Sequence, residues 1–178
     1  MKTDIGILGM GYVGLPLAIV MAEKYKVIGF DVDRNRISSL KMGIDKKKDV
    51  TSKKIIKTDL TYSNKPESLK NCNIYIVTVP TPIKNNKLPD FTFLKNASKI
   101  ISKYLKIGDI VIYESTVYPG ATEEICIPIL EISSLKINKD FYVGYSPERI
   151  NVGDQVNTLK TIPKIVSASN KYSLKKIK

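Results

Sequence analysis

Three glycines near the N-terminus have the spacing that is typical of a dinucleotide-binding loop. Gly9, Gly11 and Gly14 form the pattern G-x-G-x-x-G directly after a short apolar run. The first glycine of this pattern allows a sharp turn, the second lets a pyrophosphate approach the backbone, and the third lets a helix pack closely on a strand. Free N–H groups at the start of that helix attract an anion. The pattern predicts a phosphate-binding loop that includes Tyr12 and Val13.

An acidic residue ends the next apolar run. Asp31 follows it, about twenty positions beyond the glycines, where a carboxylate can accept a hydrogen bond from a ribose 2′-hydroxyl. A carboxylate repels a 2′-phosphate, so the sequence favours NAD over NADP. A glycine-rich turn and a solvated aspartate are the alternative, but strand, glycines, helix, strand and acid appear in the expected order. Arg36 either stacks on the adenine or ribose or is an ordinary surface arginine, and both interpretations stay open.

Polar side chains also follow three later strands. Thr81 lies between two prolines beyond one strand, Ser115 and Thr116 follow another, and Glu148 follows a third. Ligands of open α/β sheets bind beyond the carboxyl ends of the strands. A hydroxyl and a carboxylate on adjacent strand ends can hold a water between them, which makes acid–base roles available. Taken from spacing alone, Thr116 is equally a strand-end cap and Glu148 an ordinary loop carboxylate.

Alternating strands and helices must position these residues. The pattern predicts an α/β fold of the Rossmann type, a doubly wound, mostly parallel sheet with helices on both faces. The expected strands are 5–8, 26–30, 60–63, 74–79, 110–113 and 141–145. The expected helices are 13–25, a short one within 31–42, 91–105, 121–132 with a kink or early end at Pro128, and 170–178. For the lysine-rich stretch 44–58 the sequence predicts a loop with a frayed helix.

Composition narrows the class of protein. The chain has 178 residues, of which 43% are hydrophobic, enough for one domain or one domain and part of another. No apolar stretch reaches the length of about eighteen residues that spans a membrane, and the N-terminus does not have the design of a signal peptide. We therefore expect a cytoplasmic protein without a membrane partner. Its two cysteines form no metal or redox motif, so no metal site is predicted; a disulfide between them stays open but does not suit the cytoplasm.

The positive charge is nearly all lysine. The formal net charge is +12, and the only arginines are Arg34, Arg36 and Arg149. The lysines are scattered, whereas nucleic-acid sites concentrate basic residues and interleave arginine or aromatic residues. We expect a solvated surface and no nucleic-acid partner, although the excess charge attracts anionic ligands such as nucleotides.

The combined motifs resemble the UDP-glucose/GDP-mannose dehydrogenase family. The resemblance covers the chain to about residue 167. Two of the motifs, in the forms Tyr-Pro-Gly-Ala-Thr and Ser-Pro-Glu-Arg-Ile, resemble those of the branch that oxidises C6 of UDP-N-acetylhexosamines. The motifs, in order, are 9–18 (GMGYVGLPLA), 79–82 (VPTP), 114–122 (ESTVYPGAT) and 145–150 (YSPERI).

The resemblance implies an activity and residue roles. Family members oxidise the C6 alcohol of a sugar nucleotide to a carboxylate with two NAD+, for polysaccharide synthesis. The implied cofactor-binding residues are Gly9, Gly11, Tyr12, Val13, Gly14, Asp31 at the adenosine ribose, Arg36 near the adenosine, Thr81, Pro82, Ser115 and Thr116. Thr116 and Glu148 are the implied catalytic residues, with Thr116 placing a water and Glu148 managing protons at the reacting carbon. The implied substrate-lining residues are Glu148, Arg149, Ile150, Asn151 and Val152.

The chain departs from that family in length. Family chains are more than twice as long, and their nucleophilic cysteine lies further on; neither Cys72 nor Cys126 replaces it, and the chain has no histidine to activate a thiol. We expect 1–167 to be an NAD-binding domain and 168–178 to begin a helix toward an absent central domain, through which a homodimer would form. The expected function is the NAD-binding half of a UDP-sugar dehydrogenase, inactive alone. A non-catalytic nucleotide-binding module and a fragment of a β-hydroxyacid dehydrogenase-like oxidoreductase remain as alternatives.

Overall fold

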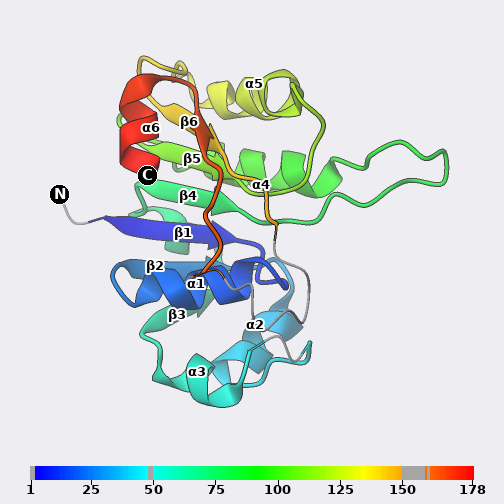
Figure 1. The fold of residues 1–178 in the computed structure, drawn as a ribbon, viewed down its shortest axis with the longest axis vertical. Coiled ribbons are helices and arrows are strands. Elements are labelled where there is room, and N and C mark those ends of the chain that lie inside the picture. Colours follow the sequence, from blue (N-terminus) through cyan, green and yellow to red (C-terminus); the bar gives the residue numbers. More distant parts are fainter. Residues whose placement is uncertain (1–2, 48–49, 150–158, 160) are drawn as a thin grey trace.

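A single seven-stranded sheet runs through the molecule (Figure 1). The computed structural model describes residues 3–47, 50–149, 159 and 161–178. The strand order is β3-β2-β1-β4-β5-β6-β7, in which the first six strands in sequence are parallel and β7 runs antiparallel to β6. The chain winds outward from β1 in both directions, so the predicted doubly wound, mostly parallel sheet is confirmed.

The elements agree with the predicted alternation of strands and helices. The strands are β1 (Asp4–Leu8), β2 (Lys26–Phe30), β3 (Leu60–Ser63), β4 (Ile74–Val77), β5 (Ile110–Tyr113), β6 (Tyr142–Tyr145) and β7 (Ser167–Ala168). The α-helices are α1 (Gly14–Ala22), α2 (Arg34–Lys41), α3 (Ser52–Lys57), α4 (Thr92–Ser102), α5 (Ile127–Leu130) and α6 (Lys171–Ile177). Short helical turns are η1 (Pro66–Leu69), η2 (Thr122–Cys126) and η3 (Glu131–Ser133).

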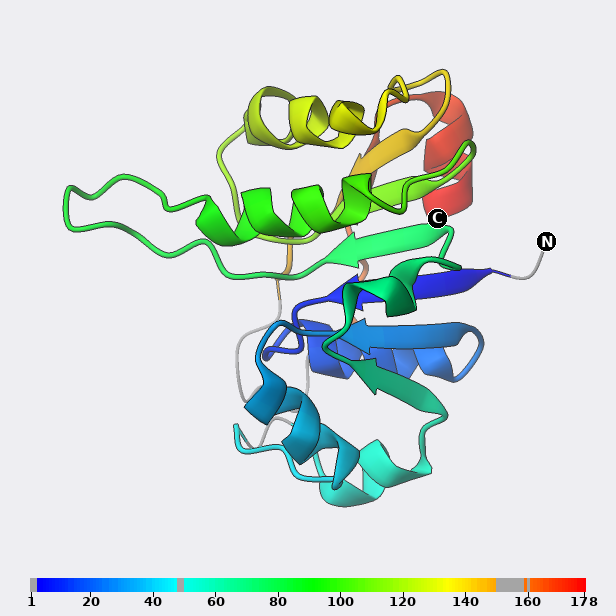
Figure 2. The same ribbon diagram turned by 180° about the vertical axis from the view of Figure 1, so that it is seen from behind.

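Two hydrophobic cores lie on opposite faces of the sheet. Strand β4 contributes to both, because Ile76 faces one core while Tyr75 and Val77 face the other, as the period-two alternation of a strand requires. Helix α1 covers the first face over β1, β2 and β3, and α6 covers it over β6 and β7, whereas α4 and α5 cover the second face (Figures 1 and 2). The strands are apolar on both faces because helices cover both.

Three elements differ from the expectation. The predicted helix 121–132 is broken into a π-helical turn, α5 and a 3-10 turn, and Pro128 stands in the first turn of α5, where its missing N–H costs no hydrogen bond. The stretch 44–58 contains the regular helix α3. Strand β7 was not predicted, since two residues are too short to give a pattern. The proposed boundary at residue 167 falls within β7, and α6 packs against β6 and β7; a second domain beyond α6 stays a prediction.

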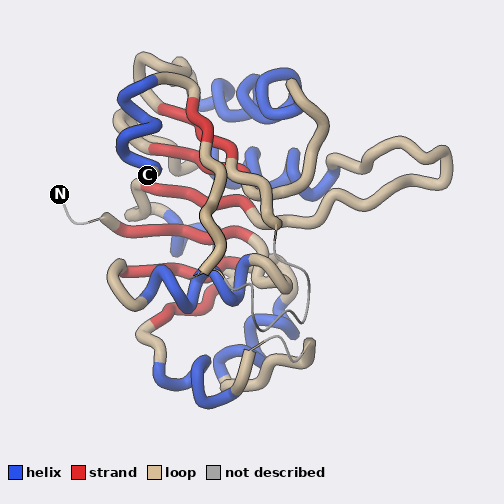
Figure 3. Tube along the Cα trace, viewed as in Figure 1, coloured by secondary structure: helices blue, strands red, loops and turns tan. Residues whose placement is uncertain are grey.

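Loops gather at the carboxyl edge of the sheet. The tan segments in Figure 3 leave the strands there, among them a long loop between β4 and α4 that extends away from the body. Parallel strands bring every βα loop to the same edge, so the polar residues that follow β1, β2, β4, β5 and β6 share it. None of the helices in the described part of the chain is long and apolar enough to cross a membrane.

Candidate cofactor and active site

The glycine loop begins with a turn that excludes other residues. Gly9 has a φ of 100°, a left-handed conformation that side chains disfavour, and its N–H donates to the carbonyl of Phe30 at 2.8 Å. A Cβ at Gly9 would lie 3.0 Å from the carbonyl oxygen of Thr78. The Thr78 hydroxyl donates to the Gly9 carbonyl at 2.8 Å, which holds the turn against the end of β4.

The other two glycines have opposite surroundings. A Cβ at Gly14 would lie 1.8 Å from the carbonyl oxygen of Gly9, so only glycine lets α1 start this close to the turn. A Cβ at Gly11 would meet no atom within 4 Å. The protein itself therefore does not require glycine at this position, and the open space above its backbone fits the approach of a diphosphate.

The start of α1 suits an anion. No side chain in the described part of the chain caps this helix, and no acidic residue stands in its first turn. Val13 occupies the N-cap position, and Tyr12 beside it is 52% exposed. Leu15 donates its N–H to the Gly11 carbonyl at 3.1 Å, and Pro16 has no N–H. The N–H groups of Tyr12, Val13 and Gly14, together with the helix dipole, are therefore what the loop offers to the diphosphate of a dinucleotide.

Asp31 lies against the glycine loop. Leu8 of β1 pairs with Phe30 of β2, so the loop and Asp31 leave neighbouring strands at the same level. One carboxylate oxygen of Asp31 accepts from the Met10 N–H at 2.8 Å, and the other accepts from the Asp33 N–H at 2.9 Å. Each oxygen keeps a second acceptor position, as a ribose diol requires.

Arg36 is not a solvated surface arginine. Its Nε donates to the Met10 carbonyl at 2.7 Å, and its Nη1 lies 2.6 Å from a carboxylate oxygen of Asp45, with the two side chains 9% and 0% exposed. Its contact with the adenosine stays a prediction. Burial raises the pKa of Asp45, but hydrogen bonds from Arg36 and from the N–H groups of Val50 and Lys47 outweigh that effect, so this pKa is lowered.

Hydroxyl groups join the ends of β4 and β5. Thr81 donates to the carbonyl of Thr116 at 2.6 Å, and the buried Ser115 donates to the carbonyl of Val79 at 2.6 Å. The structure thus brings together three residues that the sequence placed at the cofactor from two separate stretches. Pro82, the next residue on the β4 side, is exposed.

Glu148 lies beyond the end of β6. Tyr113 of β5 pairs with Tyr145 of β6, and Thr116 and Glu148 each stand three residues further along. The carboxylate accepts from the Arg149 N–H at 2.6 Å, and its side chain is 13% exposed. Thr116 and Glu148 therefore follow adjacent strands at equivalent positions. Ile150, Asn151 and Val152 lie outside the described residues.

The ammonium group of Lys164 lies near two carboxylates at the carboxyl edge of the sheet. The ammonium of Lys164 lies 2.5 Å from a carboxylate oxygen of Glu114 and 3.8 Å from one of Glu148. Burial raises the pKa of Glu114 and the Glu148 charge raises it further, whereas Lys164 lowers it. Removal of Lys164 would leave the two carboxylates without the cation that lies near both of them.

A small cavity opens beside this cluster. Its volume of about 10 Å³ is near the minimum that holds one water molecule. Glu148 and Lys164 supply polar groups to its wall, so it is suited to a water or a substrate hydroxyl. The described residues that line it are Pro147, Glu148, Arg149, Leu159, Ile162 and Lys164.

Neither cysteine is a nucleophile. Both are free and buried in the second core, as the sequence predicted for Cys126. Burial raises the pKa of Cys72 to about 12 and that of Cys126 to about 11, so both are neutral thiols at physiological pH.

Comparison with known proteins places the chain in a family. A model of the UDP-glucose/GDP-mannose dehydrogenase family, NAD binding domain, matches residues 3–178. The chain belongs to this family. It is 50% identical over 167 residues to a UDP-N-acetyl-D-glucosamine 6-dehydrogenase of Pseudomonas aeruginosa, a match that covers 93% of this chain and 40% of that protein. It is 51% identical over 170 residues to the enzyme of the same name from Salmonella typhi, covering 94% and 40%.

A solved relative has the same fold. The UDP-D-ManNAc dehydrogenase of Pyrococcus horikoshii superposes with a TM-score of 0.86 at 30% identity, over 98% of this chain and 43% of that one. The chain thus spans about 40% of the length of the curated relatives it matches, and that share is the NAD-binding domain of the family. NAD is therefore its cofactor, and the alternative of a β-hydroxyacid dehydrogenase-like fragment is not supported.

Three charged residues of this edge were missed in the sequence. Asp45 precedes three lysines in the stretch predicted as a loop with a frayed helix, although it is buried in an ion pair. Glu114 is the first residue of the motif 114–122 but received no role, and Lys164 stands alone after Pro163 without any periodic signal. Ion pairs between residues far apart in sequence leave no local pattern, so only the fold shows them.

Proposed function

We propose that this chain is the cofactor-binding part of an NAD-dependent dehydrogenase that oxidises C6 of a UDP-N-acetylhexosamine to the carboxylate, for polysaccharide synthesis. The observation that carries the proposal is the 50% identity, over 93% of the chain, with a relative named UDP-N-acetyl-D-glucosamine 6-dehydrogenase. About 60% of that relative has no counterpart in these 178 residues, so we assign full oxidation only to the chain joined to such a counterpart.

The cofactor would lie across the carboxyl edge. NAD+ supplies the hydride acceptor for the oxidation of an alcohol. The N–H groups of the loop that leads into α1, at Tyr12, Val13 and Gly14, would bind its diphosphate over Gly11, where a Cβ would meet no protein atom within 4 Å. The carboxylate of Asp31 would accept hydrogen bonds from the adenosine ribose and would repel a 2′-phosphate.

The reacting end would lie over β5 and β6. Thr116 and Glu148 stand at equivalent positions on these neighbouring strands, so a water or a substrate hydroxyl could contact both. Glu148 would take or return protons, and Lys164 would keep a positive charge beside it. Arg149 and the following residues 150–152 would line the UDP-sugar, and dimer formation would depend on a central domain.

A non-catalytic NAD-binding module is the second candidate. The absence of a reactive thiol at Cys72 and Cys126, both buried with raised pKa values, favours it. Both candidates bind NAD+, so turnover after the missing part is supplied distinguishes them.

A chimera tests the proposal. The chain is fused to the remaining part of the Pseudomonas aeruginosa relative, and NADH formation from a UDP-N-acetylhexosamine is followed by absorbance. We expect turnover that Glu148→Gln lowers by at least about a hundredfold, the usual scale of a lost acid–base group. Glu67→Gln, at an exposed glutamate of η1, is the matched control and should leave turnover unchanged. A folded chimera that binds NAD+ but forms no NADH would favour the non-catalytic module.

A further inference from the structure

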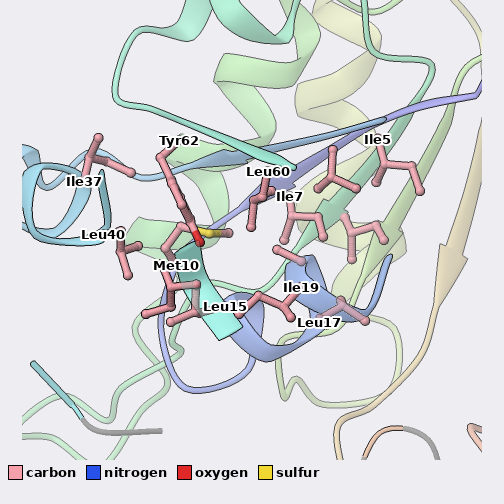
Figure 4. Close-up of a cluster of buried hydrophobic side chains, with 14 of the residues drawn as sticks. Ile5, Ile7, Met10, Leu15, Leu17, Ile19, Ile37, Leu40, Leu60 and Tyr62 are labelled. Atoms are coloured by element: carbon pink, nitrogen blue, oxygen red, sulfur yellow. The ribbon is translucent and has the colours of Figure 1, made fainter. Parts of the chain in front are cut away.

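Charged side chains hold the two peptide groups on either side of Met10. Its N–H donates to Asp31 at 2.8 Å, and its carbonyl accepts from Nε of Arg36 at 2.7 Å. The Met10 side chain is fully buried and lies beside Leu15, Leu40 and Tyr62 (Figure 4). Met10 stands between Gly9 and Gly11, so the bond from Arg36 to its carbonyl fixes the Met10–Gly11 peptide group, which carries the Gly11 N–H.

Asp45 holds the arginine in this position. Its carboxylate accepts from Nη1 of Arg36 at 2.6 Å and from the N–H groups of Lys47 at 3.1 Å and Val50 at 3.0 Å. The ion pair is buried, with side-chain exposures of 9% for Arg36 and 0% for Asp45. Breaking a buried pair leaves an uncompensated charge, so Arg36 without Asp45 would move toward solvent and release the Met10 carbonyl.

Among the described residues, Asp45 is the carboxylate that forms an ion pair with Arg36. Nη2 of Arg36 is buried and has no hydrogen-bond partner there, and the buried hydroxyl of Tyr62 is also unpaired. Both Arg36 and Asp45 act on Tyr62 electrostatically, which places the phenol next to the pair. Asp45 is therefore the anion that keeps Arg36 in place.

We propose that Asp45 is a positioning residue of the cofactor site, acting through Arg36 on the Met10 peptide and thereby on the glycine loop and Asp31. The inference rests on the proposed function, because NAD+ is the ligand that the loop would hold. Asp45 would not contact NAD+ itself, since its side chain is fully buried. It lies in the stretch 44–58, for which the sequence predicted a loop with a frayed helix and no functional residue.

Calorimetric titration of the chain with NAD+ tests this inference. Asp45→Asn should weaken NAD+ binding by about tenfold, the scale of a lost hydrogen bond to a charged group. Asp109→Asn is the matched control, because Asp109 is 3% exposed and pairs with Lys106 at 3.1 Å, at the amino edge of the sheet. Both variants should lose stability, but only Asp45→Asn should lose affinity. Equal losses of affinity would indicate general destabilisation and would overturn the inference.

A double-mutant cycle separates action through Arg36 from a purely structural role. Arg36→Lys keeps the charge but cannot donate to Met10 and Asp45 in the same geometry. If Asp45 acts through Arg36, Asp45→Asn should change NAD+ affinity by less than about twofold in the Arg36→Lys background. An undiminished tenfold effect there would overturn the inference. Should Asp45→Asn fail to fold, Asp45→Glu takes its place in the cycle.

Amide hydrogen exchange gives a readout that does not depend on the cofactor. The Met10 amide should exchange at least about tenfold faster in Asp45→Asn than in the original chain, while amides of β5 keep their rates. If the original chain binds no NAD+, the proposed function fails and this exchange decides the inference by itself. Unchanged Met10 exchange in a folded variant would overturn it.

Discussion

The three loop glycines meet different physical demands. Gly9 is required by its backbone angle, Gly14 by the 1.8 Å approach of a carbonyl oxygen to its missing Cβ, and Gly11 by nothing within the protein. A glycine without a structural reason fits a position where a ligand approaches the backbone. Gly9 and Gly14 are therefore required by the fold, whereas Gly11 fits a requirement of the cofactor.

A pair of alanine variants tests this separation. Gly14→Ala should lower the free energy of unfolding by about 2–4 kcal/mol, since backbone must shift to admit the methyl group. Gly11→Ala should change it by less than about 0.5 kcal/mol but weaken NAD+ binding by at least about tenfold. Urea denaturation and calorimetry measure the two quantities. A stable Gly11→Ala variant with full NAD+ affinity would contradict the assignment of the loop.

The two thiols should be inert in the folded chain. Burial raises the pKa of Cys72 to about 12 and that of Cys126 to about 11, so neither forms a thiolate near neutral pH. A thiol reagent should modify neither cysteine until denaturant unfolds the chain. Rapid modification of the native protein, followed by mass spectrometry, would show that one of them is accessible and reactive.

The roles of single residues could be predicted from the sequence where the residues that define a site are close together in the chain. The glycine spacing and Asp31 were found in sequence because the turn, the helix start and the strand end are all encoded nearby. The role of Arg36 stayed open until the fold showed its partner Asp45. Lys164 contacts Glu114 from fifty residues away, and no window of sequence contains both.

At the scale of elements, the ends of β5 and β6 carry the charged cluster. Glu114 follows β5 and Glu148 lies beyond β6, and Lys164 belongs to the segment that leads into β7. The short antiparallel strand β7, which the sequence did not reveal, fixes that segment beside β6. The helix 121–132 was found but not its π-helical form, since its spacing fits several helical geometries.

Removal of the lysine should give a pH-dependent loss of stability. The pKa of Glu114 is raised by burial, so the folded chain holds this proton more tightly than the unfolded one, and stability falls as the pH rises through the folded pKa. Lys164→Met removes the cation that lowers this pKa. The free energy of unfolding of the variant should be lower by about 2 kcal/mol at about pH 7, a value that allows for the partial exposure of Lys164. The decrease should be smaller at about pH 4, where Glu114 is protonated in a larger fraction of the chains.

Urea denaturation of both chains at the two pH values measures this effect. Lys164→Arg keeps the charge and should retain most of the stability. A loss in Lys164→Met that is the same at both pH values would mean that the ion pair with Glu114 is not its cause.

At the scale of the whole molecule, the doubly wound sheet explains why one edge carries all the candidate chemistry. Strands that are apolar on both faces can be read from sequence, and with them the fold class. The order of the strands places Asp31, Thr116 and Glu148 along a single edge, although they are far apart in the chain. The chain spans about 40% of the length of its curated relatives. That this edge is a cofactor site, and a catalytic site in a longer protein, is the proposal that the measurements test.

The most direct measurement of the central claim is a calorimetric titration of the chain with NAD+ and with NADP+, repeated for Asp31→Ala. We predict saturable NAD+ binding, NADP+ binding at least about tenfold weaker, and loss of that preference in the variant, because the carboxylate both accepts from the ribose and repels a 2′-phosphate. Equal affinity for the two dinucleotides, or no binding of either by the folded chain, would contradict the account.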